Sequence, residues 1–163
     1  MRKREAGFSV LELLIIGGII AILTAIAIVG YTNAINRARQ KKTVNDIRVI
    51  AQAWEQRASD TQSYQVAGFT FPTAGSLSHG SIVAALSPTY LREIPQVDGW
   101  RRPLQFGFEP GEPGSAGSYA IRSAGRDGAF EASYTPVMTN DPDCDIVWAN
   151  GTFVVYPDVM QGN

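Results

Sequence analysis

An unbroken apolar segment near the N-terminus limits what this chain can fold into more than any other feature. Between Leu13 and Tyr31 the only polar side chain is that of Thr24. The 24 residues from Phe8 to Tyr31 would form a helix of roughly 36 Å, long enough to cross a hydrocarbon core of ~30 Å. This length predicts one membrane-spanning helix, and the basic residues ahead of it favour a cytoplasmic N-terminus.

Three kinds of N-terminal segment share this pattern. A secretory signal peptide would be cut after the apolar run, and Ala25-Ile26-Ala27 could serve as its cleavage site. A signal anchor would be retained whole, and a third type of signal is cut ahead of the run. Glu12 separates these interpretations. A carboxylate in an apolar segment is unfavourable and usually marks a functional pairing, which neither of the first two types requires.

The residues around Glu12 resemble the cleavage signature of the type IV pilin-like family. Gly7 is followed by Phe8, and Glu12 stands four residues after Phe8. The resemblance implies that a prepilin peptidase cuts between Gly7 and Phe8 and methylates the new amine of Phe8. It also implies that Glu12 neutralises that amine in a neighbouring subunit during assembly. Two opposite charges in lipid are tolerable when they are paired.

The rest of the chain predicts an α+β fold in which a long N-terminal helix packs on a small antiparallel β-sheet head, as in pilins. An apolar stripe at helical spacing continues beyond the membrane segment. A short helix is expected over 81–91, and strands are expected over 104–108, 118–122, 146–149 and 152–156. The expected organisation is a leader (1–7), a transmembrane and polymerisation helix (8–30), an amphipathic stem helix (31–58) and a globular head (59–163). The stripe consists of Val44, Ile47, Ala51, Trp54 and Ala58.

Two head segments resemble the major pseudopilins of type II secretion systems. One is Asp98-Gly99-Trp100-Arg101-Arg102-Pro103-Leu104, and the other is Ser123-Ala124-Gly125-Arg126-Asp127-Gly128 followed by Asp143-Cys144-Asp145-Ile146. In that family the second loop binds calcium, so the resemblance implies a calcium site. Carboxylates and glycine turns also suit calcium chemically, although an acidic loop is more often simply solvated. The expected ligands are Asp127, Asp141, Asp143 and Asp145.

Charge and residue types argue against catalysis and nucleic-acid binding. Residues 59–163 carry eleven acids and five arginines, a balance of −6, which disfavours a polyanion as partner. His79 and Cys144 are each the only residue of their type, so histidine-based catalysis and a zinc site lack ligands. The candidate pair of carboxylates for acid–base catalysis is Asp143 with Asp145. We therefore expect no enzyme and no organic cofactor.

The predicted function is that of a structural subunit of a pilus-like filament acting in type II protein secretion. The alternative is a type IV pilin of a surface fibre for adhesion, motility or DNA uptake. The expected partners are identical and related pilin subunits, the prepilin peptidase, the inner membrane and the secretion or pilus assembly machinery. The chain should cross the bacterial inner membrane once, with its head outside the cytoplasm, and then enter a periplasmic or surface filament.

Overall fold

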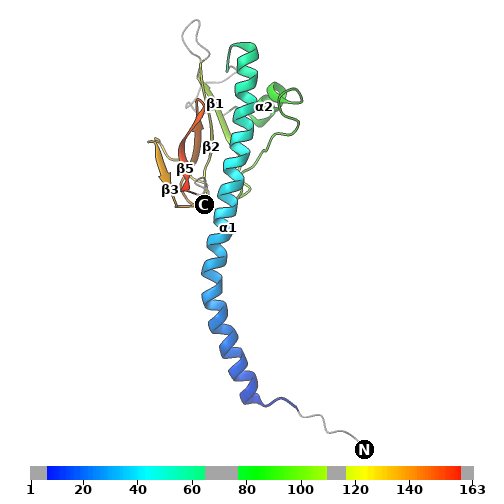
Figure 1. Ribbon diagram of the computed structural model, residues 1–163, viewed down its shortest axis with the longest axis vertical. Helices are drawn as coiled ribbons and strands as arrows, with labels where there is room; N and C mark the ends of the chain where they lie inside the picture. Colours follow the sequence, from blue (N-terminus) through cyan, green and yellow to red (C-terminus); the bar gives the residue numbers. More distant parts are fainter. Residues whose placement is uncertain (1–6, 65–76, 110–116, 159–163) are drawn as a thin grey trace, which may run out of the picture. The chain divides into compact units, whose positions relative to one another are not determined.

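The computed structural model describes residues 7–64, 77–109 and 117–158. Within them lie helices α1 (Val10–Thr61) and α2 (His79–Leu86) and five strands: β1 (Gln105–Glu109), β2 (Ser118–Ser123), β3 (Val137–Thr139), β4 (Ile146–Ala149) and β5 (Thr152–Pro157). Figure 1 shows these elements along the chain. The chain divides into two units, Met1–Asn36 and Arg37–Asn163, which share α1.

The part of α1 in the first unit carries the apolar segment. Its large apolar side chains are exposed from Val10 to Tyr31, as at Leu14 (70%) and Ile26 (73%). α1 is the one described helix that is long and apolar enough to cross a membrane, and none of its most apolar window is buried. These side chains therefore need either lipid or other protein chains around them.

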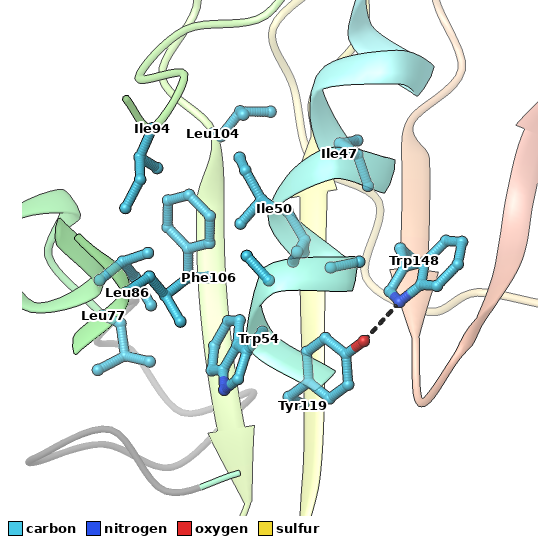
Figure 2. Close-up of a cluster of buried hydrophobic side chains, with 14 of the residues drawn as sticks. Ile47, Ile50, Trp54, Leu77, Leu86, Ile94, Leu104, Phe106, Tyr119 and Trp148 are labelled. Carbon is cyan, nitrogen blue, oxygen red and sulfur yellow. Dashed lines mark hydrogen bonds between the residues drawn. The ribbon is translucent and has the colours of Figure 1, made fainter. Parts of the chain in front are cut away.

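The part of α1 in the second unit is amphipathic, as predicted. All five residues of the predicted stripe are buried, and Ile50 and Ala53 join them. The helix ends at Thr61 instead of residue 58. Trp54 lies at the centre, with its ring 4.8 Å from that of Tyr119 and 6.5 Å from that of Phe106. Figure 2 shows this core, which also takes Leu86 from α2.

A chain of hydrogen bonds connects strands β4 and β2 to α1. The Trp148 indole N–H donates to the Tyr119 hydroxyl (2.9 Å; Figure 2). This hydroxyl donates to Glu55 Oε1 on α1 (2.6 Å). Burial, followed by the bond to Glu55, raises the pKa of Tyr119 well above its ordinary value. The phenol therefore stays protonated and can keep donating.

The sheet is mixed, whereas the sequence predicted an antiparallel one. Its strand order is β1-β2-β4-β5-β3, and the first four strands pair antiparallel. β3 pairs in parallel with β5 at one edge, with Val137 opposite Val155. Three residues are too few to show strand periodicity in the sequence, and β3 lies within the long connection from β2 to β4. The four predicted strands are confirmed within one residue or so at each end.

Turn chemistry sets the boundaries of two elements. Asn150 and Gly151 both have positive φ (46° and 90°), the geometry of the predicted two-residue hairpin between β4 and β5. α2 begins after Ser78, whose side chain accepts a bond from the Ser81 amide. It ends at Leu86 instead of residue 91, because Ser87 precedes a proline and is extended.

Candidate functional site

The predicted processing residues lie just ahead of α1. Gly7 and Phe8 are outside the helix, which begins at Val10. Phe8 is 72% exposed, and a side chain added to Gly7 would meet nothing within 4 Å. The peptide bond between them is thus in an accessible, non-helical stretch. The structure does not test cleavage at this bond, which stays a prediction.

Glu12 has a local role that the sequence reasoning missed. Its Oε2 accepts a hydrogen bond from the Ser9 amide (3.0 Å), and the Ser9 hydroxyl accepts one from the Leu11 amide (3.3 Å). This arrangement is a variant of the capping box, in which Ser and a Glu three residues later satisfy free amides at a helix start. The Ser9-x-x-Glu12 spacing was a readable signal for it. Glu12 thus has a partner within its own chain.

Two of the predicted calcium ligands serve as turn residues. Asp127 Oδ1 accepts a bond from the Ala129 amide (3.0 Å). Asp141 Oδ1 likewise accepts one from the Asp143 amide (2.9 Å). Both aspartates are exposed, and each bonds a backbone amide two residues ahead, the usual behaviour of aspartate in turns.

Asp143 is paired with an arginine. Arg126 Nε donates to Oδ1 of Asp143 (2.6 Å), and Nη2 donates to Oδ2 (2.5 Å), so both carboxylate oxygens are used. The Arg126 guanidinium lowers the pKa of Asp143 below its usual range. Two parallel bonds of this kind fix the geometry as well as the charge.

Asp145 is buried at 1% exposure and is bonded on one side only. Its Oδ2 accepts bonds from the Glu131 amide (3.0 Å) and from the Tyr134 hydroxyl. Its Oδ1 has no hydrogen-bond partner within the described ranges. Burial raises the pKa of Asp145, and the bond from Tyr134 opposes that shift.

The described side chains do not fit a calcium ion. No three His, Cys, Asp or Glu residues within the described ranges are placed to hold a metal. Among the described residues, Oδ1 of Asp145 is the one buried carboxylate oxygen without a hydrogen-bond partner. A Cβ on Gly125 (φ 59°) would lie 2.6 Å from the Cys144 carbonyl oxygen and 2.8 Å from the Asp143 carbonyl oxygen. These carbonyls therefore pack on the glycine backbone.

The two segments that suggested a pseudopilin meet in the structure. Asp98 is buried, and its Oδ1 accepts bonds from the Trp100 and Arg102 amides (2.8 Å each). Its Oδ2 accepts a bond from the Ser123 hydroxyl (2.7 Å), which joins the first segment to the second.

The first of these segments is also fixed to α1. The Gly99 amide donates to Thr43 Oγ1 (2.9 Å). A Cβ on Gly99 would lie 2.4 Å from the Arg39 carbonyl oxygen, so only glycine fits there. The sequence identified both segments as motifs but gave no sign of these contacts.

These features define a class of protein. One helix carries an exposed apolar part, in which Glu12 is the only charged residue between residues 8 and 36, and an amphipathic part that packs on a small sheet. This α+β arrangement is that of a pilin-like subunit.

Comparison with known proteins identifies the family within that class. A family model described as type II secretion system (T2SS), protein G, matches residues 30–138. The chain belongs to this family. It is 25% identical over 142 residues to type II secretion system core protein G of Pseudomonas aeruginosa, covering 80% of this chain and 92% of that protein. It is 27% identical over 147 residues to the core protein G of Dickeya chrysanthemi, covering 90% and 87%. No solved structure matches the chain.

The family match decides between the two machines that the sequence left open. It supports a pseudopilin subunit of type II secretion and does not favour a surface pilin. A pseudopilin associates with other pseudopilins and with the secretion machinery, and its apolar helix fits an inner-membrane anchor. The family is structural and is not typically enzymatic.

Proposed function

We propose that this chain is a precursor that becomes a filament subunit after cleavage between Gly7 and Phe8. The observation that carries the proposal is the exposed apolar part of α1, preceded by an accessible Gly7-Phe8 bond and bearing Glu12. Lipid would cover the apolar surface of the free subunit, and apolar segments of neighbouring subunits would cover it in the filament.

The pairing of Glu12 with a neighbour's N-terminus gives assembly a direction. A free amine at Phe8 is substantially protonated near neutral pH. Within an apolar bundle, that charge would be stabilised by a carboxylate from an adjacent subunit. Each added subunit would then bring one Phe8 amine and one Glu12 carboxylate. Only a correctly staggered neighbour would place its own carboxylate and amine so that both groups are paired.

The proposed topology follows from the same segment. The basic leader stays on the cytoplasmic side, and residues 37–163 lie outside the cytoplasm. A prepilin peptidase would act at the cytoplasmic end of the apolar helix. The head would then build a short periplasmic filament that moves folded proteins across the outer membrane.

One complementation experiment tests processing and function together. In a host lacking its own copy, the wild-type gene should restore release of type II-secreted proteins. Intact-mass analysis should show a chain that begins at Phe8 and carries one methyl group. Gly7→Leu should block cleavage through the bulk of its side chain and abolish secretion, whereas Glu5→Gln, outside the signature, should change neither.

Other masses or phenotypes would contradict the proposal. A mature chain beginning after Ala27 would identify a conventional signal peptide. If the chain retained Met1 in a secretion-competent host, this result would refute the proposed cleavage. Normal secretion without the gene, together with loss of surface fibres, would favour the pilus.

A further inference from the structure

The long connection from β2 to β4 is strongly acidic and yet ordered at both ends. Residues 124–145 contain five acidic side chains and one basic side chain, Arg126. Like charges crowded into one loop repel each other, so its closure needs a compensating positive charge. The resemblance to the major pseudopilins implied a calcium ion for this role, but the described carboxylates do not converge on one point.

Arg126 bridges the two ends of this loop through both its side chain and its backbone. The guanidinium binds both oxygens of Asp143. The Arg126 amide donates to the Pro142 carbonyl (2.9 Å), next to Asp143 in sequence. One residue therefore joins the stretch after β2 to the stretch before β4.

A second arginine supports this bridge from the neighbouring segment. Arg102 Nη2 donates to the Arg126 carbonyl oxygen (2.6 Å). The Arg102 guanidinium also lies directly over Gly128, where a Cβ would come within 1.5 Å of Nη1. Gly128 has a φ of 77°, a conformation that favours glycine, and a Cβ there would displace the Arg102 guanidinium.

We propose that Arg126 is the built-in cation of this loop and takes the place of a divalent metal ion. Its guanidinium neutralises Asp143 and holds the loop closed, with Arg102 fixing the backbone of Arg126. The guanidinium occupies one lone pair on each Asp143 oxygen and neutralises the carboxylate, and its positive charge repels a calcium ion that approaches the remaining lone pairs. Folding of the loop is therefore independent of calcium.

The test is thermal unfolding of the full-length protein in detergent micelles, followed by tryptophan fluorescence. The three tryptophans all lie within residues 37–163. The wild type should melt at the same temperature in millimolar calcium and in chelator. In chelator, Arg126→Gln should lower the midpoint by about 1–4 °C, the range for losing an exposed ion pair in a chain of this size. Arg101→Gln removes the same charge from an exposed side chain that forms no ion pair among the described residues, and it should have a smaller effect.

A charge swap and a binding measurement complete the test. Asp143→Arg and Arg126→Asp should each destabilise the protein, and the double variant should recover most of the loss. Isothermal titration of the wild type with calcium should show no saturable binding below millimolar concentration.

Three results would overturn the proposal: a calcium-dependent rise of several degrees in the wild type, tight calcium binding, or an unchanged midpoint for Arg126→Gln in chelator. Because the test measures folding and calcium binding, none of them bears on cleavage or secretion.

Discussion

Glu12 has one partner in the single chain and a different partner in the proposed filament. In the single chain its carboxylate caps the start of α1 through the Ser9 amide. In the proposed filament it would neutralise the amine of a neighbouring Phe8. A carboxylate already held at a helix start is positioned in advance, which reduces the conformational entropy lost on pairing.

Glutamine at position 12 separates the cap from the charge. Glutamine can still accept the bond from the Ser9 amide, because capping boxes use Glu or Gln, but it cannot neutralise an amine. Glu12→Gln should therefore insert and fold normally yet give little filament, measured by cross-linking and electron microscopy without a wild-type copy. Ser9→Ala should weaken the cap but keep the charge, and should still assemble. Abundant filaments from Glu12→Gln would refute the pairing role.

At the scale of elements, a buried carboxylate fastens the loop that precedes β1 to the end of β2. Asp98 accepts bonds from the Trp100 and Arg102 amides and from the Ser123 hydroxyl. The adjacent Gly99 fixes the same loop to α1 through Thr43. Helix, loop and sheet thus meet at one turn.

Asp98→Ala should be among the most destabilising changes in the head. It removes an acceptor from three donors at a buried position, so we expect a loss of about 2–4 kcal/mol in the free energy of unfolding. Ser123→Ala removes one of these bonds and should cost about 1 kcal/mol. Urea denaturation of the detergent-solubilised protein would measure both. As a control, Asp158→Ala lies outside this network and should change the free energy of unfolding little. Equal losses for Asp98→Ala and Asp158→Ala would contradict the role assigned to Asp98.

At the scale of the whole molecule, the features that the sequence predicted are those set by residues close together in the chain. The apolar stripe of α1, the strands and the Asn150-Gly151 hairpin follow from side-chain spacing and turn preference, and the structure confirms them. β3 was missed because a three-residue strand has no periodicity of its own. The pairing of Arg126 with Asp143 joins residues 17 apart, and no local pattern encodes it.

The division into two units leads to a prediction about the whole chain. Every buried residue of the described structure belongs to the unit Arg37–Asn163. A truncated chain beginning at Arg37 should therefore remain folded and monomeric without detergent, with a melting temperature close to that of the full chain. Size-exclusion chromatography and circular dichroism would measure this. A truncated chain that aggregates or lacks a cooperative transition would show that folding needs the first 36 residues.

The parallel pairing of β3 has a consequence for the order of folding. Within the described sheet, β3 lies at the edge and pairs with β5 alone, although β5 follows it in the chain. In the proposed topology the leader stays in the cytoplasm and residues 37–163 cross the membrane in chain order, so residues 137–139 emerge before the strand they must join. Until residues 152–157 arrive, their backbone donors and acceptors stay bonded to water. The acidic connection from β2 to β4, which contains β3, therefore joins the sheet last. A pause late in translocation would expose this connection to periplasmic proteases.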